Sequence, residues 1–213
     1  MKKFTREAGI AAPFPQADIN TDAILPAQWM RSTSTDLGDG LFGRWRYDPK
    51  GKEVPDFILN RTPYRQAKII VGGPNFGCGS SRESAVWALQ GFGIRSVIAP
   101  SFGDIFFENS FKNGLLPIVL SEAEVGELLN FLTTTNDPSL TIDLENSRIE
   151  TPQGRAIPFA ISAARRTALL EGLDEIGQTL RHEAEIAAFQ ARDCVTRPWI
   201  HHRSRGLIEK ARG

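Results

Sequence analysis

The sequence predicts an α/β protein with a parallel βαβαβ core, followed by an antiparallel β-meander and C-terminal helices. Three short apolar runs in the centre of the chain have strand character, and a helical pattern follows each of them. Because strands that alternate with helices form parallel sheets through right-handed crossovers, this pattern defines the core. Beyond about residue 136, short alternating segments follow one another without intervening helices, which is typical of antiparallel pairing.

The core elements follow in order from residue 68. The apolar runs are short enough for buried strands, and Gly114 stands where a glycine often ends a helix. The predicted order is strand 68–73, helix 81–91, strand 96–99, helix 104–113, strand 116–120 and helix 122–132.

The remaining segments are less regular. Residues 31–63 are polar and rich in Gly, Asp, Pro and Arg, which predicts a long loop outside the core. The predicted elements on either side of the core are short strand-like pieces in 1–35, meander strands at 140–144, 148–150 and 157–161, and helices at 163–171 and 174–191. We therefore expect one domain, 1–195, with the loop excursion 31–63, and a basic tail, 196–213.

The composition excludes several classes of function. Twenty-five basic residues balance 25 acidic ones, so no overall charge favours nucleic acid or an anionic membrane as a partner. No signal peptide or transmembrane pattern is present, so a reducing, cytoplasmic location is expected. Cys78 and Cys194 cannot supply the thiolates of an iron–sulfur cluster, and no metal-ligand spacing occurs. We therefore expect this chain to bind no metal or cofactor.

The most informative stretch runs from Gly73 to Glu83 and joins the first core strand to the first helix. Its two inner glycines permit a tight turn that a ligand can approach closely. Hydroxyls and unpaired N–H groups at the helix N-terminus, with a guanidinium beside them, favour binding of a carboxylate. The residues predicted to form this site are Gly79, Ser80, Ser81 and Arg82.

Other interpretations of this stretch remain open at this point. Ser80 and Glu83 fit a capping box, which stabilises a helix without any further role. Cys78 could be a nucleophile near a helix N-terminus, as in a self-sufficient hydrolase. However, the three histidines that could activate a nucleophile are all late in the chain, at His182, His201 and His202. The stretch is not a dinucleotide fingerprint, a P-loop or a hydrolase elbow.

Several separated motifs, taken together, resemble one family. The first has the form Asp-x-x-Thr-Asp-x-x-x-Pro, and the central one reads Asn-Phe-Gly-Cys-Gly-Ser-Ser-Arg-Glu. In order along the chain, the motifs are Asp18–Pro26, Asn75–Glu83, Ala99–Phe106, Lys112–Val119 and Gly172–Leu180. From about residue 12 to about residue 192, the chain resembles the small subunits of 3-isopropylmalate dehydratase, in the aconitase superfamily.

This resemblance implies a swivelling β/β/α domain that closes over a large partner subunit. That partner holds a [4Fe–4S] cluster, whose iron acts on the departing hydroxyl of the substrate. The implied reaction interconverts 2-isopropylmalate and 3-isopropylmalate by loss and return of water, in leucine biosynthesis. The resemblance implies that Ser80 is the base and that it acts as an alkoxide. The residues that it places around a small dicarboxylate substrate are Gly79, Ser81, Arg82, Thr21 and Asp22.

Two departures from the family pattern bear on the substrate. Ser84 stands where the family usually has histidine, and the stretch Gln28–Arg31 lacks the usual basic-aromatic-leucine order. We expect residues from Gln28 to about Tyr47 to cover the substrate, with Trp29 and Met30 against its alkyl group. An apolar lining favours isopropylmalate over a tricarboxylate. Alternatives are a dehydratase for citraconate or citramalate, dimethylmalate or homoaconitate, and a non-catalytic regulatory paralogue.

Overall fold

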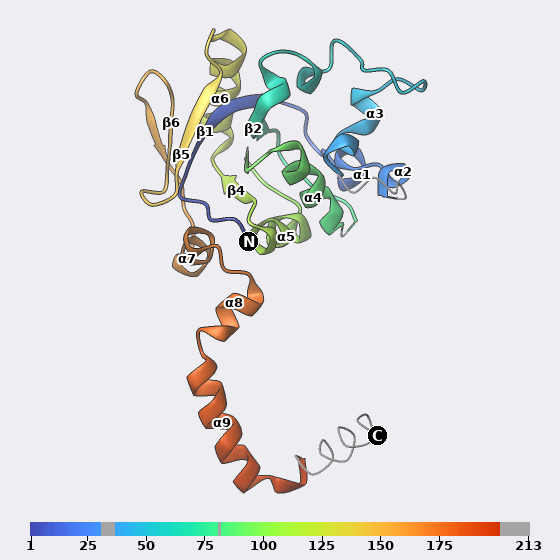
Figure 1. Cartoon of the computed structure of the whole chain (residues 1–213). Helices are drawn as coiled ribbons and strands as arrows, with labels where there is room; N and C mark the ends of the chain where they lie inside the picture. The colour runs from blue at the N-terminus through green and yellow to red at the C-terminus, as the bar shows by residue number, and fades with distance from the viewer. Residues whose placement is uncertain (31–36, 81, 201–213) are drawn as a thin grey trace. The chain divides into compact units, whose positions relative to one another are not determined.

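The computed structural model describes residues 1–30, 37–80 and 82–200 (Figure 1). The chain divides into two compact units, Met1–Asp174 and Glu175–Gly213, and each is described by itself. The division predicted at residue 195 stays a prediction.

A mixed sheet of seven strands forms the centre of the first unit (Figure 1). The strand order is β4-β3-β2-β1-β5-β6-β7. Neighbours from β4 to β1 are parallel, whereas β5, β6 and β7 add on antiparallel. The strands are β1 (Arg6–Phe14), β2 (Ala67–Gly72), β3 (Ser96–Ala99), β4 (Leu116–Val119), β5 (Ser139–Asp143), β6 (Arg148–Glu150) and β7 (Ala156–Pro158).

Both faces of the sheet are buried, and the side chains of the inner strands alternate between them. Ile70 faces the core beneath α4, whereas Ile69 and Val71 face the core beneath α6 and α7. The helices of the first unit are α1 (Thr21–Ile24), α2 (Ala27–Met30), α3 (Gly43–Arg46), α4 (Glu83–Phe92), α5 (Asp104–Asn113), α6 (Glu122–Thr134) and α7 (Ala163–Glu171).

The predicted parallel core and the meander are confirmed. Four predicted elements have the bounds that the structure gives them, namely β3, α5, β6 and α7. The sequence did not identify β1 as a nine-residue strand between β2 and β5. In the second unit, the predicted helix 174–191 is divided into α8 (Glu175–Leu180) and α9 (Glu183–Thr196).

The segment after residue 36 contradicts the prediction that 31–63 lies outside the core. Leu41, Phe42 and Leu59 are fully buried. The side chain of Arg46 is also buried, and its Nε donates to Asn60 Oδ1 at 3.3 Å. The polar composition gave no sign of this packing. The buried guanidinium of Arg46 forms its hydrogen bonds within the segment itself rather than with solvent. The predicted portion 31–36 lies outside the described residues.

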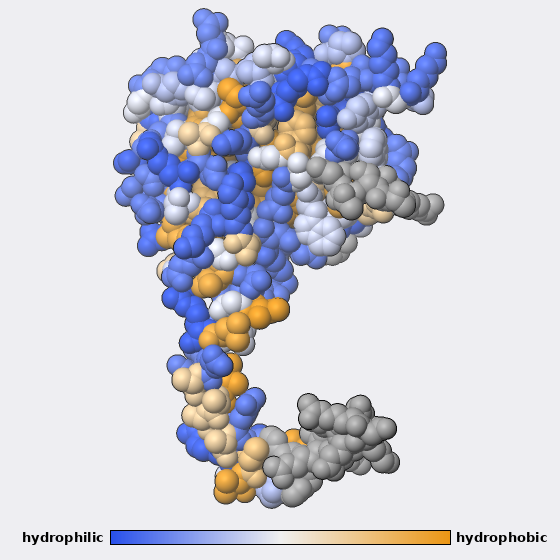
Figure 2. Space-filling model, viewed as in Figure 1, coloured by the Kyte–Doolittle hydropathy of each residue, from blue (hydrophilic) through white to orange (hydrophobic). Residues whose placement is uncertain are grey.

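The second unit exposes apolar side chains along α8 and α9, visible as orange surface in Figure 2. Ile176, Leu180 and Val195 are 71%, 60% and 80% exposed. Throughout the residues that the structure describes, no helix combines the length and apolar character needed to cross a bilayer.

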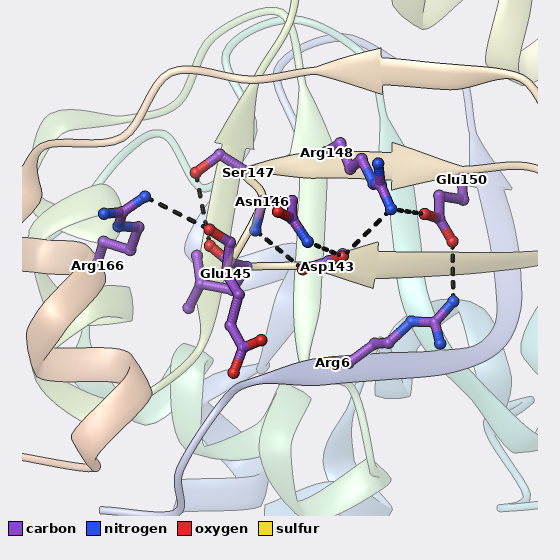
Figure 3. Close-up of polar contacts among 9 residues, drawn as sticks. Arg6, Asp143, Glu145, Asn146, Ser147, Arg148, Glu150 and Arg166 are labelled. Atoms are coloured by element: carbon purple, nitrogen blue, oxygen red, sulfur yellow. Dashed lines mark hydrogen bonds and ion pairs between the residues drawn. The ribbon is translucent and has the colours of Figure 1, made fainter.

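A polar cluster joins β1 to the meander at the end of β5 (Figure 3). Asp143 accepts hydrogen bonds from the backbone N–H of Asn146 at 3.0 Å and from its Nδ2 at 2.7 Å. Arg148 lies 3.6 Å from Asp143 and 2.8 Å from Glu150, which also binds Arg6 at 2.9 Å. Because Asp143 lies opposite both Arg6 and Arg148 in the sheet, it links three strands.

We expect Asp143→Asn to lower the free energy of unfolding by about 1 to 2 kcal/mol near neutral pH. The hydrogen bonds from Asn146, helped by Arg148 and Arg6, hold the pKa of Asp143 below its usual value of 3.8. A depressed folded-state pKa gives stabilisation that is fully present above the unfolded-state value, about 3.9, and lost as the pH falls through the folded-state value. The difference between wild type and variant should therefore shrink below about pH 4.

Chemical denaturation at about pH 7 and about pH 3 measures this effect. Glu145→Gln is the matched control, because Glu145 is an exposed carboxylate in the same turn. An equal loss of stability at both pH values would contradict the ionic role of Asp143.

Candidate functional site

The turn after β2 presents Ser80 at the protein surface. Gly77 and Gly79 have φ of 73° and 93°, in the left-handed region that favours glycine. A Cβ at Gly77 would lie 2.2 Å from Cγ of Phe106, and one at Gly103 would lie 2.6 Å from the carbonyl oxygen of Gly77. The turn and the start of α5 therefore touch with almost no side chain between them.

The first motif is bound directly to this turn through the backbone. The N–H of Gly77 donates to the carbonyl of Ile19 at 2.7 Å, and the N–H of Thr21 donates to the carbonyl of Cys78 at 2.9 Å. The hydroxyl of Thr21, which is 2% exposed, donates to the carbonyl of Ser80 at 3.0 Å. The Oγ1 of Thr21 also lies 3.4 Å from the Oγ of Ser80. The structure thus brings Thr21 against Ser80.

A second pair of motif side chains holds the outer ends of the same segments together. Asn75 donates through Nδ2 to Asp18 Oδ1 at 2.7 Å, and Ser101 Oγ accepts from the N–H of Asn75 at 2.8 Å. Asp18 and Asn75 both have positive φ, 56° and 58°. Both residues belong to the sequence motifs, but the motifs alone predicted no role for them. Their contact depends on the folded arrangement, so no local pattern could have revealed it.

Arg82 is paired with Asp22, the neighbour of Thr21. Its Nη1 donates to Asp22 Oδ1, and the Arg82 side chain is 26% exposed. The two residues predicted separately as substrate contacts are therefore partners of each other. A substrate carboxylate at Arg82 would have to share the guanidinium with Asp22 or replace it.

The capping box that the sequence allowed does not form. The N-cap of α4 is Arg82, in an extended conformation, with no side-chain cap. The carboxylate of Glu83 instead accepts from Nδ2 of Asn113 at 2.7 Å. Ser80 is therefore free of the structural role that competed with a chemical one. Ser81 lies outside the described residues, so its predicted role stays a prediction.

The two residues expected to contact the alkyl group lie in different surroundings. Trp29 is partly buried and packs so closely on Gly43 that a Cβ there would lie 2.3 Å from its indole nitrogen. Met30 is 40% exposed, and its Sδ accepts from the hydroxyl of Ser84 at 3.3 Å. Met30 is thus placed beside the first turn of α4, whereas Trp29 anchors the segment that follows.

A small surface pocket of about 220 Å³ opens beside Ser80. The turn after β2 forms one side of it, and the start of α5 forms the other. Its lining residues are Gly77, Gly79, Ser80, Gly103, Asp104, Ile105 and Phe106. Pockets that enclose a small molecule usually measure about 300 to 1,000 Å³. This pocket is therefore smaller than the usual range for enclosing a small molecule on this chain alone.

The environment of Cys78 argues against a thiolate nucleophile. Burial, and then the negative charge of Asp18, raise the pKa of the Cys78 thiol. The unit Met1–Asp174 contains no histidine to activate either Cys78 or Ser80. Within the described ranges, no three His, Cys, Asp or Glu side chains are grouped to hold a metal ion. These observations do not support a self-sufficient hydrolase.

Comparison with known proteins gives one consistent result. The aconitase C-terminal domain family matches residues 1–123, and the family described as the C-terminal domain of the 3-isopropylmalate dehydratase small subunit matches residues 175–203. The 3-isopropylmalate dehydratase small subunit of Dinoroseobacter shibae is 50% identical over 94% of this chain and all of its own length. That of Gluconobacter oxydans is 49% identical over 98% of this chain and all of its own length.

A solved structure agrees with these relatives. The crystal structure of 3-isopropylmalate dehydratase from Methanocaldococcus jannaschii matches with a TM-score of 0.62 and 27% identity. The match covers 86% of this chain and 99% of that one. The chain therefore belongs to the family of 3-isopropylmalate dehydratase small subunits, within the aconitase superfamily.

Proposed function

We propose that this chain is the small subunit of a heteromeric hydro-lyase that interconverts 2-isopropylmalate and 3-isopropylmalate, with Ser80 as its base. The observation that supports this most strongly is the exposed Ser80 hydroxyl beside Thr21 and the Asp22–Arg82 pair. This arrangement occurs in a chain about half identical to curated small subunits of that enzyme over nearly its whole length.

The residues of the turn suit removal of a proton from a carbon next to a carboxylate. Arg82 binds that carboxylate through its guanidinium, which fixes the position of the neighbouring C–H bond. Ser80, as an alkoxide, takes the proton, and the electrons of the C–H bond form a double bond as the hydroxyl leaves the adjacent carbon. Ser80 then returns the proton to the carbon that lost the hydroxyl, and the hydroxyl adds to the carbon that lost the proton. This gives the isomer and restores the Ser80 alkoxide.

A serine alkoxide requires a positive environment from which water is excluded. Arg82, which is paired with Asp22, lies two residues from Ser80 in the sequence. The turn leads into the N-terminus of α4, and the first residues of α5 line the same pocket, so both helix ends can contribute positive potential. The pocket is open to solvent on this chain alone, so a partner surface is needed to exclude water. This requirement explains why the base and the rest of the site belong to different subunits.

That partner is proposed to be a large subunit with a [4Fe–4S] cluster, which supplies a Lewis acid for the departing hydroxyl. The two cysteines of this chain are too few to hold such a cluster. In addition, burial raises the pKa of the Cys78 thiol, which disfavours the thiolate that would bind iron. We further propose that the complex works in the cytoplasm.

Substrate preference is proposed to depend on Met30 and Ser84. Their side chains meet beside the start of α4, and the thioether of Met30 is the apolar group proposed to contact a branched alkyl group of the substrate. Neither side chain provides a cation for a third carboxylate. This supports isopropylmalate over a tricarboxylate such as homoaconitate, while smaller methyl-substituted acids remain the alternative substrates. Trp29 supports this wall by fixing α2 against Gly43.

The chain alone should show no dehydratase activity, because it holds the base without the Lewis acid. Mixed with a cluster-loaded large subunit, the wild type should interconvert the two isopropylmalates. Ser80→Ala should lower kcat by at least about a hundredfold, the usual effect of losing a general base. Ser121→Ala, which removes a hydroxyl that caps α6 on another part of the surface, is the matched control.

Three outcomes would contradict this function. Turnover by the chain alone would refute the division of the site between subunits. Full activity of Ser80→Ala would refute Ser80 as the base, although the assignment of the chain to the family would still hold. Inactivity of the wild type in a proven complex with a competent large subunit would favour a regulatory paralogue.

The reconstituted pair should prefer isopropylmalate to citramalate or dimethylmalate by about tenfold or more in kcat/KM, because each buried methylene adds about 1 to 3 kcal/mol of discrimination. Met30→Ala should reduce that preference, whereas Met30→Leu should retain most of it. A panel of these acids together with homocitrate-type acids measures the ratios. Preference for a tricarboxylate would overturn the apolar-wall argument.

A further inference from the structure

Thr21 has a buried hydroxyl that its own helix does not use. The N-cap of α1 is Asn20, whose side chain already accepts from the N–H of Ala23 at 2.8 Å. The backbone N–H of Thr21 is also satisfied, by the carbonyl of Cys78. The first motif is therefore fixed to the turn without the hydroxyl of Thr21. Something other than local structure must account for a hydroxyl at this position.

Among the residues that the structure describes, that hydroxyl has one proton and two acceptors within reach, both on Ser80. The carbonyl oxygen lies at 3.0 Å and the Oγ at 3.4 Å. While Ser80 is protonated, the carbonyl is the better acceptor, and the oxygen of Thr21 can accept from the Ser80 hydroxyl. If Ser80 loses its proton, its Oγ becomes a charged acceptor, which attracts a donor more strongly than a carbonyl does.

We propose that Thr21 is a positioning residue for Ser80, whose hydroxyl turns from the Ser80 carbonyl to the Ser80 Oγ when that oxygen becomes an alkoxide. This inference rests on the proposed function, because it requires Ser80 to be the base. Rotation about one C–O bond is fast and moves no heavy atom. The turn can therefore hold both protonation states of Ser80 in one backbone conformation, an advantage because a preorganised donor needs no rearrangement during reaction.

The test compares Thr21→Val, which keeps the shape and loses the hydroxyl, with Thr21→Ser, which keeps the hydroxyl. In the complex with the large subunit, Thr21→Val should lower kcat by about tenfold to a hundredfold, the usual effect of losing a hydrogen bond to a charged group. KM should change little, because Thr21 does not contact substrate in this proposal. Thr21→Ser should restore most of kcat.

The pH profile separates positioning from packing. Loss of a donor to the alkoxide makes the charged form less stable, so the rising limb of kcat against pH should move to higher pH in Thr21→Val. A packing defect alone would lower the plateau without moving the limb. Thr133→Val is the matched control, because Thr133 is exposed on α6 and its hydroxyl donates to the carbonyls of Leu129 and Asn130 in the same helix.

Each outcome decides the proposal. Wild-type kcat and an unmoved limb in Thr21→Val, with Ser80→Ala inactive, would overturn the role of Thr21 and leave the proposed function standing. Equal losses in Thr21→Val and Thr21→Ser would also overturn it. Full activity of Ser80→Ala would overturn both. If Thr21→Val fails to assemble, Thr21→Ala provides the hydroxyl-free variant and must show the same displacement of the limb.

Discussion

The site depends on one constraint, the backbone pairing of the first motif with the turn after β2. Gly77 and Gly79 adopt left-handed conformations, and the N–H of Gly77 and the carbonyl of Cys78 are both taken up by residues 19–21. Because these groups are fixed by partners far away in the sequence, the position of Ser80 depends on the first motif as well as on the turn itself. The neighbouring contact leaves no space for a side chain at Gly103.

The sequence predicted those elements whose local pattern and tertiary role agree. The strand Ser96–Ala99 and the helix Asp104–Asn113 have clear apolar patterns and clear ends, and both have the predicted bounds. β1 was missed because its middle, Gly9 to Pro13, is poor in residues that favour strands. It is a strand because β2 and β5 pair with its two edges. Burial of Arg46 was equally invisible, since its acceptors are backbone carbonyls and Asn60.

For the site, residue types could be read from the sequence but partnerships could not. Hydroxyls, a guanidinium and glycines near a helix start were evident, and the structure places Ser80 at the surface as expected. The pairing of Arg82 with Asp22 needs 60 residues of chain to fold before the two side chains meet. The same holds for Glu83, whose carboxylate accepts a hydrogen bond from Asn113 instead of capping its own helix. Local propensity describes the groups available, and tertiary structure decides which of them meet.

The position of β1 also determines the order in which the chain can fold during synthesis. Its parallel neighbour β2 emerges from the ribosome before its antiparallel neighbour β5, which lies more than a hundred residues beyond β1 in the sequence. Until β5 is made, one edge of the strand is unpaired and offers its N–H and C=O groups to other nascent chains. The half of the sheet that bears Ser80 can therefore fold first. Once the meander is synthesised, β5 pairs with that edge and removes a site at which nascent chains can aggregate.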